Sequence, residues 1–102
     1  MGSKIRIENP KHLDEKLTKA IEYLRSIGCK EIILFGSLSN GRFDKFSDID
    51  LAVSGISPGA YFRAVAVLYS IVGWKVDLVA MDYVSKDFAQ RIRKRGKILY
   101  AA

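Results

Sequence analysis

The sequence predicts an α+β fold, a small mixed β-sheet with helices packed on one face, and three observations lead to this prediction. Apolar residues first recur with the period of a helix between Leu13 and Ile27. Two short apolar runs follow, Ile32–Phe35 and Leu51–Val53, and their connection is short enough for antiparallel neighbours. A third β-like run, Lys75–Ala80, comes only after a second apolar helix. Strands joined both by a short turn and by a helix form a mixed sheet.

The first helix is expected to begin at Asn9-Pro10, an N-cap followed by proline, and to end at Gly28. Its apolar residues lie on one face, which we assign to the core: Leu13, Leu17, Ala20, Ile21, Leu24 and Ile27. Upstream, residues 4–8 alternate polar and apolar side chains, which is compatible with an additional edge strand.

The second helix is expected to begin at Ser57-Pro58-Gly59 and to continue to Val72, and it is apolar on nearly every side. One side can pack on the sheet. The other is either buried by the remaining helices or is a surface, near residues 60–72, for a partner protein or a second copy of the chain.

The last helix is expected to be capped by Ser85, with Phe88, Ala89 and Ile92 facing inward, before a short final strand over residues 97–100. A basic cluster marks its second half. Such a cluster is either a solvated face or a contact for phosphate or an acidic partner. Its members are Arg91, Arg93, Lys94, Arg95 and Lys97.

Length and composition narrow the function classes. The 102 residues suit a single domain, residues 1–102, with room for one core. No apolar run reaches the length of a membrane span and no signal-peptide core is present, so we expect a cytoplasmic protein. The lone Cys29 reads as a packed residue rather than a nucleophile. A net charge of +6 is by itself weak evidence for nucleic-acid binding.

Three aspartates form the candidate active site. Asp48 and Asp50 are two residues apart in a strand, so their side chains leave on one face, and Asp77 is central in the later strand. Folding alone gives no reason to hold like charges together. A neighbouring strand could bring Asp77 beside the pair, and carboxylates gathered in this way either take up protons or bind a hard cation such as Mg²⁺, which we favour. This polar face must stay open to a ligand, so the helices are expected on the other face.

A glycine-serine turn precedes the first two aspartates. Gly36 and Gly41 allow backbone conformations closed to other residues and a close approach of a ligand to the main chain. With the amide and hydroxyl of Ser37 at the start of the turn, the segment is suited to holding phosphate oxygens beside the metal.

Gly36-Ser37, Asp48-x-Asp50 and Asp77 together resemble the nucleotidyltransferase superfamily with the DNA polymerase β type of palm fold, and most closely its minimal members. The resemblance implies that Asp48 and Asp50 ligate two Mg²⁺ ions. It also implies that Asp77 binds one ion and helps deprotonate the attacking hydroxyl, and that the Gly-Ser turn holds a nucleoside triphosphate. Where the family often has Ala-Arg, this chain has Ser39-Asn40; Arg42 is a candidate for the missing positive charge.

The resemblance also implies a reaction and a partner. We expect Mg²⁺-dependent transfer of a nucleoside monophosphate, AMP from ATP, to a hydroxyl. Many minimal members act as the antitoxin of a HEPN-domain toxin, which makes a HEPN-type protein the expected acceptor. The alternatives are an antitoxin that neutralises its HEPN partner by binding alone, and nucleotidyl transfer to a small molecule.

Overall fold

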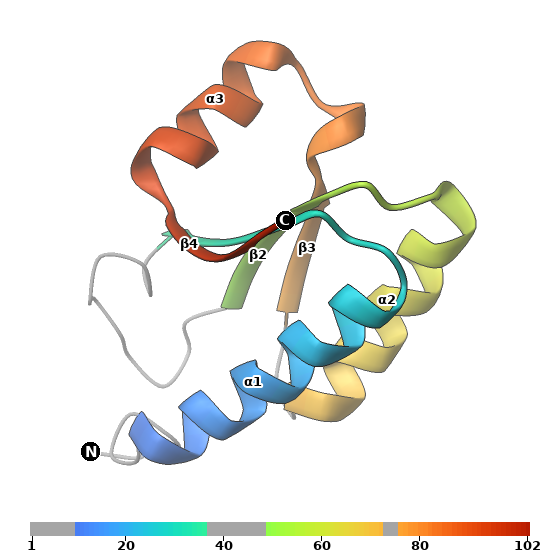
Figure 1. Ribbon diagram of the computed structural model, residues 1–102, viewed down its shortest axis with the longest axis vertical. Coiled ribbons are helices and arrows are strands. Elements are labelled where there is room, and N and C mark those ends of the chain that lie inside the picture. The colour runs from blue at the N-terminus through green and yellow to red at the C-terminus, as the bar shows by residue number, and fades with distance from the viewer. Residues whose placement is uncertain (1–9, 37–48, 73–75) are drawn as a thin grey trace.

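The computed structural model describes residues 10–36, 49–72 and 76–102, with side chains from residue 15 onward (Figure 1). The helices are α1 (Pro10–Ser26), α2 (Pro58–Val72) and α3 (Lys86–Arg95), and a 3₁₀ turn, η2 (Met81–Tyr83), precedes α3. The strands are β1 (Glu31–Phe35), β2 (Ile49–Ser54), β3 (Val76–Ala80) and β4 (Lys97–Ala101). This order confirms the predicted α+β class. The possible strand over residues 4–8 lies outside the described residues.

The four strands form one mixed sheet in the order β3-β2-β1-β4. β1 is antiparallel to β2, as the short connection between them predicts. β1 is also antiparallel to β4. β3 runs parallel to β2, because α2 carries the chain back across the sheet between them.

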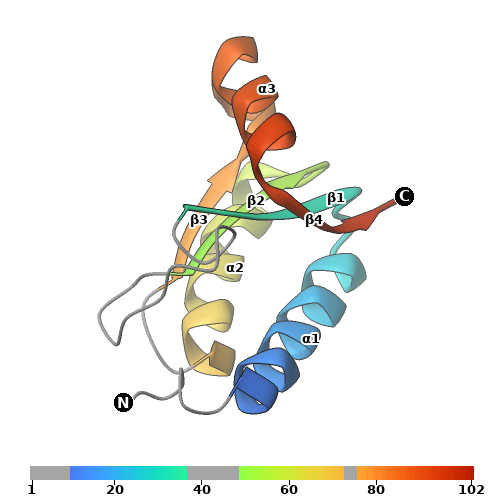
Figure 2. The ribbon, with the colours of Figure 1, turned by 90° about the vertical axis from the view of Figure 1, so that its left-hand side faces the viewer.

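Two helices cover one face of the sheet. α1 and α2 lie side by side beneath it in Figure 2. Alternate residues of the central strands point into this layer, and several are fully buried, including Ile32, Leu51 and Val53. They pack against Ala20 and Leu24 of α1 and against small and branched residues of α2. This apolar layer is the main core of the domain.

The third helix lies on the opposite face, which corrects the prediction that all helices share one face. Ala89 and Ile92 of α3 pack on Ile33 and Ala52, the alternate residues of β1 and β2. The central strands are therefore apolar on both sides over part of their length and need cover on both. Phe88, predicted to face inward, stands at the rim of this contact with 38% of its surface exposed.

Polar contacts fix the position of α3. The predicted cap is present, since Ser85 Oγ accepts a hydrogen bond from the Phe88 amide at 3.1 Å. Arg93 donates two hydrogen bonds to the Glu31 carboxylate, at 2.8 and 3.1 Å, which links α3 to the first residue of β1. Ser54 Oγ donates to the same carboxylate at 2.9 Å. These hydrogen bonds hold Arg93 at the Glu31 end of β1, and they therefore fix the rotation of α3 about its own axis.

The Glu31–Arg93 pair predicts an acid-sensitive contribution to stability. The Arg93 hydrogen bond holds the pKa of Glu31 below its ordinary value of 4.5 in the folded state. The ionised carboxylate therefore stabilises the fold fully above pH 4.5, and this contribution is lost as the pH falls through the lower folded-state pKa. Because the pair is partly exposed, we expect it to be worth about 0.5–1 kcal/mol.

Urea unfolding of wild type and Glu31→Gln at pH 7 and at pH 3 measures this term. The wild type should be the more stable at pH 7, and the difference should shrink at pH 3. A difference that is constant across this range would show that the charge of Glu31 plays no part.

No helix in the described ranges is long and apolar enough to cross a membrane.

Candidate functional site

On the α3 side of the sheet, strand register aligns side chains in three rows, two that run across β1, β2 and β3 and one that runs across β1 and β2. The pairing of β1 with β2 and of β2 with β3 defines each row. The middle row lies under α3, and the row at the Glu31 end receives Arg93. The rows are Glu31 with Ser54; Ile33 with Ala52 and Val79; and Phe35 with Asp50 and Asp77. We call the third the carboxylate row.

The carboxylate row brings two of the three predicted aspartates together. Asp50 and Asp77 are directly paired in the parallel register, and paired residues of neighbouring strands leave on the same face. Asp77 is exposed and Asp50 is partly buried. Asp48, which precedes β2 directly, lies outside the described residues, as do Ser37 and Arg42.

Gly36 is shaped around the carboxylate of Asp50. The glycine directly follows β1, and its φ of +76° lies in the left-handed region that favours glycine. A Cβ placed on it would overlap the Oδ2 atom of Asp50. The predicted phosphate turn and the predicted metal ligand are therefore in contact where the turn begins. Only a residue without a side chain leaves Asp50 in this position.

Gly36→Ala is expected to displace the Asp50 carboxylate and to reduce nucleotide binding by about tenfold or more, since strain and overlap together cost roughly 2 kcal/mol. Calorimetric titration with Mg²⁺ and a non-hydrolysable ATP analogue measures the loss. Gly59→Ala is the matched control, because a Cβ at Gly59 meets no atom within 4 Å. Equal binding by the two variants would show that Gly36 does not position Asp50.

The chemistry of this row fits a hard cation. Two carboxylates side by side on one face of a sheet repel one another unless a positive charge joins them. Their oxygens are the donors that Mg²⁺ prefers. Among the described residues, no group of three or more Asp, Glu, His or Cys side chains gathers anywhere. Asp50 and Asp77 are thus the part of the predicted donor set that the structure places.

Thiol chemistry does not compete for the site. Cys29 is buried between α1 and β1, and burial, followed by the charge of Asp82, raises its pKa to about 11. The side chain is therefore a protonated thiol at neutral pH, in keeping with the packing role expected for it.

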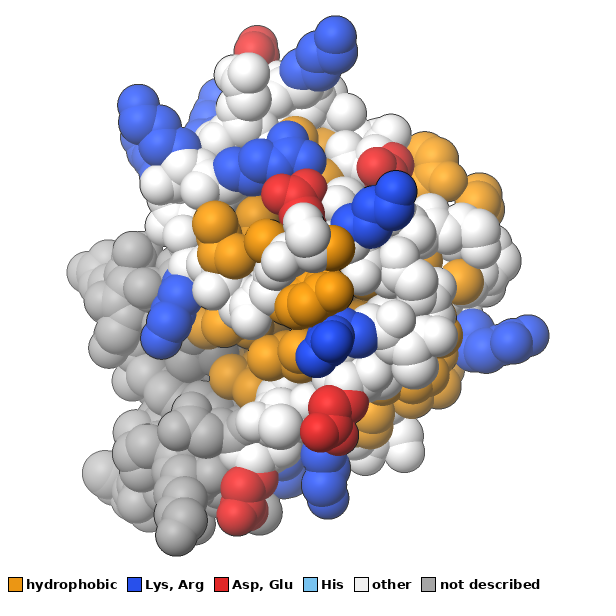
Figure 3. Space-filling model, viewed as in Figure 1, with side chains coloured by type: hydrophobic (Ala, Val, Ile, Leu, Met, Phe, Trp, Pro, Cys, Tyr) orange, Lys and Arg blue, Asp and Glu red, His pale blue; other side chains and the backbone are white. Residues whose placement is uncertain are grey.

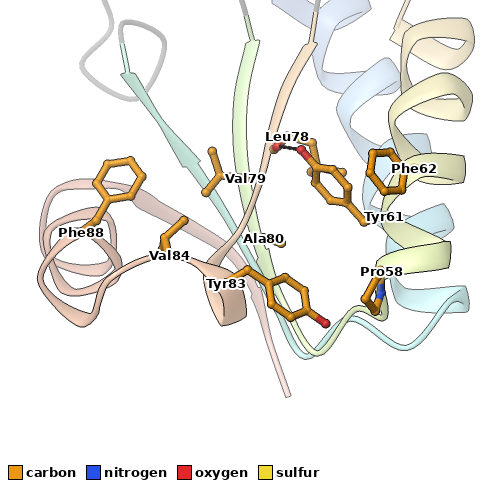
Figure 4. A pocket seen from close by; sticks show the side chains of 9 residues that line it. All are labelled: Pro58, Tyr61, Phe62, Leu78, Val79, Ala80, Tyr83, Val84 and Phe88. Atoms are coloured by element: carbon orange, nitrogen blue, oxygen red, sulfur yellow. Dashed lines mark hydrogen bonds between the residues drawn. The ribbon is translucent and has the colours of Figure 1, made fainter.

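Beside the carboxylate row, an apolar groove follows the outer edge of β3. This β3 groove has a volume of about 550 Å³ and lies between α2 on one side and η2 with α3 on the other (Figure 4). Tyr61 donates a hydrogen bond to the Leu78 carbonyl at 2.7 Å across it. The groove was not predicted from the sequence. Tyr61 and Phe62 were assigned to the apolar second helix and Phe88 to the inward side of the last helix, and no local pattern joins them with Tyr83.

The apolar helix α2 is buried on one side only. Ala64, Leu68 and Val72 face the sheet. Phe62 and Tyr69, seven residues apart on the other side, remain 73% and 59% exposed. Of the two predicted outcomes for this helix, burial accounts for one side, and an exposed apolar stripe remains on the other.

Comparison with solved structures finds the same fold. A toxin–antitoxin complex with AMP-PNP contains a chain that is 31% identical, with a TM-score of 0.71; the match covers 86% of this chain and 73% of that one. A tri-AMPylated HEPN toxin of Shewanella oneidensis in complex with its MNT antitoxin gives 28% identity and a TM-score of 0.69, covering 88% and 73%. A minimal nucleotidyltransferase, described as putative, shares the fold at 19% identity and a TM-score of 0.76, covering 84% and 91%.

Sequence comparison gives the family. None of the curated proteins compared with this chain matches it. The sequence model of the family described as "Polymerase beta, Nucleotidyltransferase" matches residues 15–102, which include Gly36 and all three predicted aspartates. With the four-stranded mixed sheet and the paired carboxylates in place, the chain belongs to the polymerase β nucleotidyltransferase family.

Proposed function

We propose that this protein is a Mg²⁺-dependent nucleotidyltransferase that transfers AMP from ATP to a hydroxyl of a HEPN-type partner protein, and that it is the antitoxin of that pair. The observation that carries the proposal is the carboxylate row. Asp50 and Asp77 are 27 positions apart in sequence, and the parallel register of their strands sets them side by side. Gly36, at the start of the predicted phosphate turn, contacts one of them.

In the proposed reaction the acceptor oxygen attacks the α-phosphorus of ATP, and the bond to pyrophosphate breaks as the new phosphoester bond forms. Asp48, Asp50 and Asp77 would hold two Mg²⁺ ions, whose positive charge would lower the pKa of the attacking hydroxyl and neutralise charge on the leaving pyrophosphate. Asp77 stands at the outer strand and receives the acceptor proton. Gly36, Ser37 and Arg42 hold the phosphates.

The partner assignment is supported by two independent features. Two of the similar structures are toxin–antitoxin complexes, one of them described as an AMPylated HEPN toxin with its MNT antitoxin. The chain also exposes apolar surface, which does not stabilise an isolated domain in water. This surface consists of Phe62 and Tyr69 on α2 and the walls of the β3 groove. A protein acceptor could cover such a surface while presenting its hydroxyl to Asp77.

Transfer is tested with ATP labelled at the α-phosphate, Mg²⁺ and the protein encoded beside this chain. Label should appear on the partner. No label should be transferred when EDTA is present from the start, or when the γ-phosphate carries the label. The γ-label control separates nucleotidyl transfer from phosphoryl transfer.

A second candidate function is neutralisation of the partner by binding alone, and the exposed stripe on α2 favours it. In that case the two proteins co-purify, but no label is transferred. Phe62→Asp should then abolish both co-purification and neutralisation. Under the proposed catalytic function, by contrast, one exposure to active enzyme is sufficient, because the partner stays modified after the two proteins separate.

A further inference from the structure

The two flanks of α3 face opposite ends of the sheet. α3 crosses the sheet over the middle row, through Ala89 and Ile92. Arg93 reaches the row at the Glu31 end, so that flank of the helix is directed away from the carboxylates. The other flank therefore overhangs the carboxylate row. Successive rows are two residues apart along each strand, which is roughly 7 Å and within the reach of an arginine side chain.

The flank above the carboxylate row carries Phe88, Arg91 and Arg95, whose spacing of three and four residues places them along one side of a helix. Figure 4 shows that Phe88, which projects from α3, lines the β3 groove together with Val79 of the middle row. Lys94, between the two arginines in sequence, belongs to the outward side, nearly opposite Ala89 and Ile92. One helix thus carries two arginines on the flank above the carboxylate row and one lysine on its outward side.

The end of α3 comes close to the strand that leads into Gly36. Gly96, which ends the helix, lies against the Ile33 side chain and the Leu34 carbonyl, where an added Cβ would be 3.0 Å from that oxygen. The backbone of Arg95, the residue before Gly96, therefore lies next to the last residues of β1. Positive charge gathers over α3 in the upper part of Figure 3.

The two arginines are not used by the fold. Within the described part of the chain, no hydrogen bond or ion pair engages the guanidinium group of Arg91 or Arg95, and both residues are exposed. Arg93, by contrast, is held by Glu31. Cations that are free of carboxylate partners and belong to the flank above two aspartates are suited to an anion that the aspartates bind through a metal.

We infer that Arg91 and Arg95 bind the phosphate groups of the nucleotide in the carboxylate row. This inference rests on the proposed function and names the side chains that supply positive charge where Asn40 stands at the family's usual arginine. A guanidinium group can donate two parallel hydrogen bonds to a phosphate, so two of them can hold a polyphosphate from the side of α3.

The test is the affinity of the full chain for Mg²⁺ with a non-hydrolysable ATP analogue, measured by titration calorimetry. Replacing both arginines by glutamine, Arg91→Gln with Arg95→Gln, should weaken binding by about 10- to 100-fold and make it less dependent on salt. Adenosine, which has no phosphate, should be affected little. Lys94→Gln is the matched control, since it removes one positive charge from the same helix and should leave the affinity within about twofold.

The outcomes separate this inference from the proposed function. Tight binding by wild type with equal affinity in the arginine and lysine variants would overturn the inference alone. Absence of nucleotide binding by wild type would overturn both. If the arginine variant lost affinity for a single-stranded RNA but kept it for the ATP analogue, the flank would be a nucleic-acid surface and the inference would be wrong. Thermal unfolding of each variant confirms that α3 remains in place.

Discussion

Asp77→Asn is expected to reduce Mg²⁺-dependent transfer of labelled AMP by at least about 100-fold while the domain stays folded. The amide has the size of the carboxylate but no charge, so the cation loses a ligand that supplies several kcal/mol of charge stabilisation. Because Asp77 is exposed and sits beside Asp50, replacing it also removes a repulsion between like charges. Stability should therefore be unchanged or slightly increased. Asp50→Asn should give the same loss of transfer.

The control for this pair of variants is Asp87→Asn. Asp87 is an exposed carboxylate of α3 on the side away from the sheet, so its loss changes the net charge by the same amount without touching the carboxylate row. Transfer is followed by the label on the partner protein, and folding by circular dichroism. Full activity in Asp77→Asn, with Asp87→Asn as reference, would reject the assignment of the active site.

Leu51→Ala is expected to lower the free energy of unfolding by about 2–5 kcal/mol. Leu51 is fully buried in the strand between β1 and β3, and its side chain packs in the layer beneath α1 and α2. Removing three carbon atoms there leaves a cavity. The two helices and the sheet cannot fill it, because they are already packed against one another. A domain of this size has little stability to spare, so the variant should be partly unfolded at 37 °C.

Urea unfolding of Leu51→Ala and of Ile98→Ala measures the difference. Ile98 is an apolar residue of the edge strand β4, yet 58% of its surface is exposed, so its truncation should cost under about 1 kcal/mol. Similar losses in the two variants would contradict the placement of the core beneath the sheet.

Local patterns were sufficient for the elements of the fold. Proline at position 10 and the serine caps before α2 and α3 predicted where helices begin, because a cap satisfies backbone amides within one turn. The stripe through Leu17, Ala20 and Leu24 predicted the buried side of α1. The two-residue spacing of Asp48 and Asp50 predicts a shared face, and this stays a prediction because Asp48 lies outside the described residues. Each of these signals depends only on residues a few positions apart.

The sequence by itself determined the helices and the strands of the described ranges, and it favoured the family; the three carboxylates of the site stay a prediction. Tertiary structure alone decided that Asp77 pairs with Asp50, that α3 crosses the second face of the sheet, and that Phe88 stands at the rim of a groove. Register and helix placement depend on contacts between segments dozens of residues apart, such as Arg93 with Glu31. No local pattern carries that information, because the same apolar strands could be covered on one face or on both.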